Sequence, residues 1–65
     1  MEIKTWQARS EKGVTLVELA AATGISKSTL NNIENGRVSP TMVQMEAIAK
    51  ALRTRITDLF DSEYK

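Results

Sequence analysis

Apolar residues recur every three or four positions along most of the chain, a spacing that places them on one side of an α-helix. The repeat is clearest over residues 15–23 and 41–52, where polar residues occupy the intervening positions. Three glycines and one proline divide the chain into helix-length segments. We therefore predict an all-α fold with five short helices and a polar tail. The predicted helices span residues 2–12, 15–23, 26–35, 41–52 and 57–61, and the tail spans residues 62–65.

Residues that favour helix ends support these boundaries. Thr15 is a good N-cap, and Glu18 three positions later completes the pattern of a capping box. Ser26 can cap the next helix in the same way. The Asn35–Gly36 pair that follows is also a strong hairpin signal, but a hairpin needs alternating strands on both sides. The flanks are helical in pattern, so we interpret this pair as a helix end.

The length of 65 residues predicts a single domain with one small core. In the first helix, Ile3 and Trp6 lie one turn apart, and we expect Trp6 to fill the core with its indole N–H reaching the surface. In the fourth helix, we expect Met42 and Met45 to be core residues as well. Such a chain has no room for a deep pocket, which makes regulation by a bound small molecule an unfavoured interpretation.

The chain contains no Cys and no His, which excludes zinc fingers and most catalytic constellations. No Ser or Lys stands beside an evident base, so we expect neither an enzyme nor a metal or cofactor site. The longest apolar run is residues 19–22, far short of the roughly 20 residues that span a membrane. No pattern typical of a secretion signal is present. We therefore expect a cytoplasmic protein with no membrane partner.

The net charge of +1 does not by itself indicate a polyanionic partner. Its distribution is uneven, because residues 1–55 carry eight Lys or Arg and five Asp or Glu, which is +3. Residues 56–65 carry one basic and three acidic residues, which is −2. This asymmetry permits a basic face on the body of the domain without establishing one.

The segment 24–36 has an unusual polar face for a helix. At about 100° per residue, five polar side chains share an arc of about 140°, and Leu30 and Ile33 lie on the opposite side. The five polar residues are Lys27, Ser28, Asn31, Asn32 and Asn35. Solvated helix faces are usually rich in Lys, Glu and Gln, whereas Asn and Ser favour helices poorly. Both can bond base edges and phosphate oxygens. Composition alone leaves a solvated face and a contact face equally open.

The stretch "TLVELAAATGISKSTLNNIENG", residues 15–36, resembles the helix-turn-helix of the phage repressor and Cro family, also called the XRE family. In that resemblance, Ala20 lies where the two helices cross, Gly24 makes the turn and Ile25 is buried just after it. The likeness continues through "SPTMVQMEAIAKAL" and "ITDLF", which are similar to the fourth and fifth helices of the family. It covers roughly residues 3–60 and implies a compact five-helix fold of the lambda-repressor type.

The family resemblance implies that the second helix of the motif enters the major groove of double-stranded DNA. Lys27, Ser28 and Asn32 then occupy base-reading positions, with Lys27 suited to guanine and Asn32 to adenine. Asn31 lies nearer the groove wall, where either a base or a phosphate contact is open. Each of these side chains has the alternative of being exposed without any contact.

Phosphate contacts are implied on both sides of this helix. The N-terminus of the preceding helix, at Thr15 and Leu16, offers backbone N–H groups to an anion, and Thr15 also serves as an N-cap. Asn35 and Arg37 match family positions that contact the DNA backbone, and Arg37 is the stronger candidate because of its charge.

The family also places a structural pair at Arg9 and Glu34, which would position the reading helix. One departure from the family is Arg53, which stands after the fourth helix where glycine is usual. Arginine in a left-handed cap costs about 1 kcal/mol or more, so we expect this helix to continue or to end differently. Arg53 and Arg55 are then a basic patch that can contact phosphate, pair with Asp58 or Asp61, or remain in water.

The function implied is a sequence-specific transcriptional regulator that binds double-stranded DNA. We expect a repressor that acts as a homodimer on a palindromic operator, with the dimer surface on the five helices. Candidate dimer residues are Leu59, Phe60 and Tyr64, although Leu59 and Phe60 have the alternative of closing the monomer core. The rival hypothesis is a protein-interaction module, either antitoxin-like or an adaptor, in which the polar helix binds a protein partner.

Overall fold

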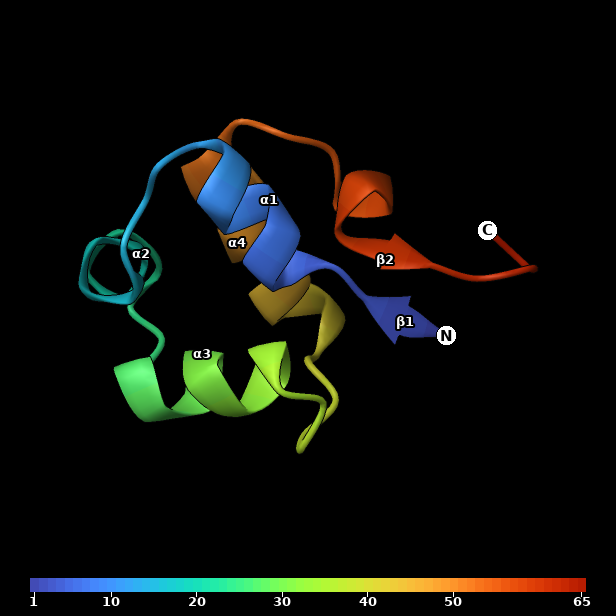
Figure 1. Cartoon of the computed structure of the whole chain (residues 1–65), viewed down its shortest axis with the longest axis horizontal. Coiled ribbons are helices and arrows are strands. Elements are labelled where there is room, and N and C mark those ends of the chain that lie inside the picture. Colours follow the sequence, from blue (N-terminus) through green and yellow to red (C-terminus); the bar gives the residue numbers. More distant parts are fainter.

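The computed structural model describes residues 1–65 and is mostly helical, with four α-helices, one short 3-10 helix and one pair of strands (Figure 1). The elements in chain order are β1 (Glu2–Ile3), α1 (Thr5–Glu11), α2 (Leu16–Thr23), α3 (Lys27–Glu34), α4 (Met42–Leu52), η1 (Ile56–Leu59) and β2 (Phe60–Asp61). The helical fold class is confirmed, but the prediction of five helices is wrong. The differences lie at the two ends of the chain.

The two helices of the motif begin and end where the capping residues indicated. The Thr15 hydroxyl accepts a hydrogen bond from the Glu18 backbone N–H at 3.1 Å and caps α2. Ser26 caps α3 in the same way by accepting from the Thr29 N–H. Gly24 between the helices has a φ of 73°, a left-handed conformation that a residue without a Cβ adopts at little cost. The chain therefore turns sharply from α2 into α3.

The core lies where α4 packs against α2, η1 and α1. Its buried apolar residues come from four different elements, so the core is complete only when all four elements pack together. They are Leu19, Leu30, Met45, Ile48, Ala49, Leu52 and Leu59. Leu30 anchors α3 to this core, and Ile33 on the same face of α3 is also buried. The reading-helix candidate is thus fixed to the body of the domain through its apolar side.

The predicted first helix begins three residues later than expected, because residues 2–3 form a strand instead. Glu2 pairs with Asp61 and Ile3 pairs with Phe60 in antiparallel register, and the Lys4 N–H donates to the Leu59 carbonyl at 2.7 Å. Ile3 packs against the core from this strand. No helical stripe through Ile3 and Trp6 therefore exists.

Two expected core residues lie outside the core. Trp6 is 54% exposed in the first turn of α1, where the buried residue is Thr5. Met42 is 67% exposed because it is the first residue of α4, whereas Met45 one turn later is buried as predicted. A repeat in sequence identifies the buried side of a helix, but not how far along the helix the neighbouring elements extend.

The predicted fifth helix, 57–61, is a 3-10 helix of four residues that continues into β2. Such a short element seldom forms an α-helix by itself, and Phe60 is committed to the pairing with Ile3. The predicted tail folds back on this region, since Lys65 Nζ donates to the carbonyls of Thr57 and Phe60 at 2.9 Å each.

Helix α4 ends at Arg53 in the left-handed conformation that glycine usually supplies. Arg53 has a φ of 54° and a ψ of 48°. The Thr54 N–H donates to the Ala49 carbonyl at 2.9 Å, and the Arg53 N–H donates to the Lys50 carbonyl at 3.3 Å. These are the two hydrogen bonds of a Schellman cap. The expectation that this helix would continue or end differently is wrong, because the capping bonds offset the strain of a left-handed arginine.

We expect Arg53→Gly to raise the free energy of unfolding by about 1 kcal/mol, since glycine adopts this φ without the Cβ clash. For a domain of this size, the melting temperature rises by roughly 4–8 °C. Lys50→Gly is the matched control, because it also removes an exposed positive charge from α4 but lies inside the helix. It should lower stability by about 1 kcal/mol. Thermal unfolding, monitored by circular dichroism, measures both variants. A lower melting temperature for Arg53→Gly would show that the left-handed conformation of Arg53 does not cost stability.

Candidate nucleic-acid interface

Helix α3 lies along an outer side of the molecule (Figure 1), and its polar face is exposed to solvent. Its C-terminal end, at Asn35 and Gly36, lies beside Glu2 of β1 around one hollow. Four of its five polar residues are exposed, and Asn32 is half-buried. The exposed four are Lys27, Ser28, Asn31 and Asn35. The opposite side of α3 is buried through Leu30 and Ile33. The structure therefore brings the predicted base-reading residues together on one accessible surface.

The side chains of Lys27, Ser28 and Asn32 have no hydrogen-bond partner within the chain. Capping of α3 uses Ser26, whose hydroxyl accepts from the Thr29 N–H and donates to the Thr29 hydroxyl at 2.8 Å. Ser28 is thereby left free of any capping role. Three polar side chains at the start and middle of α3 are available for a ligand.

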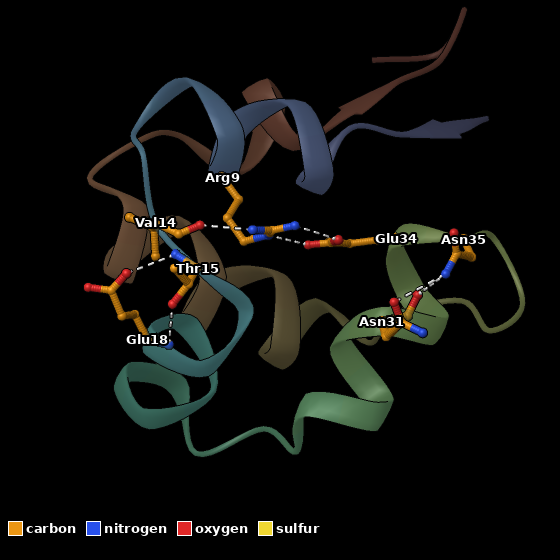
Figure 2. A network of polar contacts seen from close by, with 7 residues as sticks. All are labelled: Arg9, Val14, Thr15, Glu18, Asn31, Glu34 and Asn35. Atoms are coloured by element: carbon orange, nitrogen blue, oxygen red, sulfur yellow. Dashed lines mark hydrogen bonds and ion pairs between the residues drawn. The ribbon is translucent and has the colours of Figure 1, made fainter.

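Asn35 and Asn31 are joined to each other. Asn35 Nδ2 donates to the Asn31 carbonyl at 2.9 Å and to Asn31 Oδ1 at 3.3 Å (Figure 2). Both contacts of the Asn35 amide nitrogen are thus to Asn31. This engagement within the chain disfavours the direct phosphate contact that the family resemblance implied for Asn35. Hydrogen bonds between side chains four positions apart are common on helices, so this spacing was a signal that the sequence already contained.

Glu18 occupies part of the predicted phosphate site at the start of α2. Its Oε1 accepts a hydrogen bond from the Thr15 backbone N–H at 2.9 Å (Figure 2). The Thr15 N–H is thus not free for an anion, whereas the Leu16 N–H has no partner in the chain. The pKa of the exposed Glu18 carboxyl is lowered. The main cause is this hydrogen bond from the Thr15 backbone, and the second is a hydrogen bond with the Thr15 side chain. The site therefore carries a negative charge beside the remaining free N–H.

Arg9 and Glu34 are joined by two nearly parallel hydrogen bonds. Arg9 Nε donates to Glu34 Oε2 at 2.7 Å, and Arg9 Nη2 donates to Glu34 Oε1 at 3.0 Å (Figure 2). The side chains are only 13% and 6% exposed, respectively. The bond to Glu34 raises the pKa of Arg9 against the opposing effect of burial. The predicted pair thus connects α1 directly to the last turn of α3.

The third Arg9 contact was not evident from the sequence. Arg9 Nη1 donates to the Val14 carbonyl at 2.9 Å, in the segment that leads into α2 (Figure 2). One guanidinium therefore holds α1, the start of α2 and the end of α3. No pattern in the sequence predicts which backbone carbonyl faces an arginine, because that depends on the path of the loop.

Arg37 lies just beyond α3 in a defined position. Its backbone N–H donates to the Asn32 carbonyl at 2.9 Å, and the Gly36 N–H donates to the Ile33 carbonyl, which together form a Schellman cap. Gly36 takes the left-handed conformation with a φ of 72°. The Arg37 side chain is exposed and forms no ion pair. A free positive charge thus follows directly after the polar face.

Arg53 and Arg55 are exposed and also form no ion pair. The two acids proposed as their partners are occupied elsewhere. Asp58 accepts from the Thr54 hydroxyl at 2.9 Å and from the Arg55 backbone N–H at 3.2 Å, and Asp61 pairs with Lys65 at 3.6 Å. Neither arginine therefore forms an ion pair with Asp58 or Asp61. The pKa of the Asp58 carboxyl is lowered by its bond with the Thr54 side chain, then by the Arg55 backbone N–H, and also by the charge of Arg55.

The dimer candidates differ in accessibility. Leu59 is fully buried in the core of a single chain, so it cannot contribute to a dimer surface, and this part of the prediction is wrong. Phe60 is half-buried, with the Lys65 ammonium 5.6 Å from its ring centroid, and Tyr64 is exposed.

No helix of the structure has the length and apolar character needed to cross a membrane.

Comparison with known proteins identifies the family. The family model described as helix-turn-helix matches residues 7–59. An HTH-type transcriptional regulator of Methanothermobacter thermautotrophicus is 42% identical over 53 residues, covering 80% of this chain and 77% of that protein. The HTH-type transcriptional regulators SinR and SlrR of Bacillus subtilis are 35% and 36% identical over 60 and 56 residues. Those alignments cover 91% and 85% of this chain, but only 54% of SinR and 37% of SlrR.

The solved complex of the SinR and SinI proteins contains a chain with the same fold. The TM-score is 0.81 at 33% sequence identity, over 92% of this chain and 59% of that one. Together with the family match, this similarity confirms the resemblance drawn from residues 15–36. The chain belongs to the helix-turn-helix family of the XRE type, whose members are DNA-binding transcriptional regulators.

We expect loss of either partner of the Arg9–Glu34 pair to destabilise the fold strongly. Glu34→Met leaves the Arg9 charge buried without its partner, which costs about 3 kcal/mol. Arg9→Met in the same background removes that orphaned charge, so the double variant should be less destabilised than the sum of the single ones by more than about 1 kcal/mol. Urea unfolding of the four proteins measures this coupling. Strictly additive losses would show that the two side chains act independently.

We expect Glu18→Gln to tighten DNA binding, because it keeps an oxygen for the Thr15 N–H and removes a negative charge from the start of α2. A unit charge about 4 Å from a phosphate in water is worth about 1 kcal/mol, or about fivefold in affinity. The gain should be similar for all DNA sequences and should decrease as salt is raised. Glu11→Gln, on the face of α1 beside Thr54 and Asp58, is the control. Equal affinities for Glu18→Gln and wild type at low salt would exclude α2 from the DNA interface.

Proposed function

We propose that this helix-turn-helix protein represses transcription by binding a palindromic operator as a homodimer, with α3 in the major groove. The observation that carries the proposal is the exposed polar face of α3 with three free side chains. Lys27, Ser28 and Asn32 have no partner in the chain, and donors and acceptors of this kind discriminate base pairs in the major groove. Helix α3 is the second helix of the motif, which is the helix that reads bases in this type of fold.

The charges around α3 agree with a DNA backbone on either side of the groove. Arg37 stands free after the C-terminus of α3, and Lys27 begins the helix. The free Leu16 N–H at the start of α2 adds a donor for phosphate. Phosphate contacts of this kind set the position of a protein on DNA, whereas the α3 side chains supply the sequence preference.

A homodimer follows from the size of the module. A single small domain buries about 600–1,000 Å² on DNA, which limits affinity. Two copies on one face of the duplex place their reading helices about 34 Å apart. The longest dimension of the chain is 31 Å, so two adjacent copies can occupy neighbouring half-sites. Occupation of such a site blocks access by other proteins, which is the simplest route to repression.

A protein partner is the second candidate, since the structurally similar SinR chain was solved in a complex with the SinI protein. If the polar face of α3 binds a protein instead of DNA, binding to duplexes will show no preferred site and no steep dependence on salt. The same binding measurement therefore separates the two functions.

We expect selection from random duplexes to return a palindrome bound by two chains in sedimentation. On that site, Asn32→Ala should lose discrimination at one base position in each half-site, costing about 1–3 kcal/mol. Arg37→Ala should weaken binding to all sequences alike and reduce the salt slope by about one. Gln7→Ala, which removes an exposed amide from the α1 face beside Thr54, is the control and should bind as wild type does. Recovery of no preferred sequence would reject sequence-specific repression.

A further inference from the structure

The Asn35 side chain is held in one orientation by the backbone of its own helix. Its Nδ2 lies 2.9 Å from the Asn31 carbonyl oxygen, which can only accept a hydrogen bond. The amide of Asn35 must therefore direct its nitrogen, and not its oxygen, at this carbonyl. The Asn35 backbone N–H also donates to the Asn31 carbonyl at 3.0 Å, so both groups of Asn35 converge on the same residue.

This orientation determines how the Asn31 side chain is turned. The second N–H of the Asn35 amide is directed at Asn31 Oδ1, 3.3 Å away. Asn31 must then have its oxygen toward Asn35 and its nitrogen on the far side, as Figure 2 shows. Asn31 Nδ2 has no acceptor within the chain. To the surroundings, the Asn31 side chain is a hydrogen-bond donor.

The two adjacent asparagines of α3 therefore differ in chemistry. The Asn32 side chain has no partner in the chain, so its amide is free to donate and accept at once, as pairing with adenine requires. Asn31 has its oxygen turned toward Asn35 and its amide nitrogen turned outward, so the group that it presents to a ligand is a donor. An exposed donor is matched by the acceptors of DNA, and it is not matched by the amino groups of adenine or cytosine.

We propose that Asn35 is a positioning residue that holds the Asn31 amide with its nitrogen outward, so that Asn31 donates to an acceptor atom of DNA. That acceptor is a phosphate oxygen or a major-groove acceptor of a base, namely N7 of guanine or adenine, O6 of guanine or O4 of thymine. The inference rests on the proposed binding of DNA by α3 and assigns Asn35 a role other than the direct phosphate contact predicted from the sequence. Asn35 acts on DNA recognition only through Asn31.

The orientation is testable in the free protein by NMR. Exchange of the Asn35 side-chain amide protons with solvent should be slower than exchange of the Asn32 side-chain protons, because only the former are hydrogen-bonded. In the Asn35→Ala variant, the Asn31 side-chain resonances should shift, while those of Asn32 change little. Equal exchange at positions 32 and 35 would overturn the inference without any reference to DNA.

The consequence for recognition is testable on the operator recovered by selection. If Asn31 faces a base, Asn35→Ala should reduce the preference for an acceptor over an amino group at that base pair by about fivefold, the effect of one net hydrogen bond. If Asn31 faces a phosphate, Asn35→Ala should weaken all sequences by a similar factor, and a methylphosphonate at that phosphate should abolish the difference.

A double-mutant cycle separates positioning from a direct contact. Adding Asn35→Ala to Asn31→Ala should cause no further loss of affinity or preference if Asn35 acts through Asn31. An additional loss equal to that in wild type would overturn the inference. Melting temperatures show whether each variant is folded, and Gln7→Ala is the control for the loss of an amide elsewhere. If the wild-type protein selects a site but Asn35→Ala leaves binding to it unchanged, the inference about Asn35 is wrong and the proposed function stands. If the wild-type protein selects no site, the proposed function is wrong as well.

Discussion

The attachment of α3 to the rest of the domain depends on one part-buried cation, Arg9. Arg9 donates to both carboxylate oxygens of Glu34 and to the Val14 carbonyl, so α1, the start of α2 and the end of α3 share a single guanidinium. A charge with so little exposure is tolerated only when its donors are satisfied. The requirement therefore fixes more than stability. The bonds to Glu34 hold the last turn of α3 against α1, and the buried side chains of Leu30 and Ile33 also fix α3 to the domain.

The polar residues of α3 and its surroundings form two groups, according to whether their side chains make hydrogen bonds inside the chain. Residues whose hydrogen bonds are used inside the chain maintain geometry, such as Ser26 at the N-cap and Asn35 at the C-terminal end. Residues with no internal partner, such as Lys27 and Asn32, are available to a ligand. Glu18 belongs to the first group through its capping bond, although its charge opposes a phosphate at the same helix start. In the proposed interface, the hydrogen bonds that cap the helices therefore limit which groups are available to DNA.

Local signals in the sequence were sufficient for the centre of the chain. Caps at Thr15 and Ser26 depend only on residues three positions away, and the helices they predicted are those observed. The ends could not be predicted in this way, because Ile3 and Phe60 form strands only through pairing with each other across the whole chain. Exposure of Trp6 has the same cause. At the candidate site, the family resemblance predicted the contact face of α3 and the Arg9–Glu34 pair. The orientation of the Asn35 side chain could not be predicted without the positions of its atoms.

We propose above that the polar face of α3 contacts DNA and that β2 lies outside this interface. NMR titration of the ¹⁵N-labelled chain with its selected duplex tests this most directly. The account predicts that amide resonances shift in α3, at Leu16 and at Arg37, and that those of β2 remain unchanged except for any residues at a dimer contact. Shifts confined to the strand pair and η1, with α3 unaffected by saturating duplex, would contradict it.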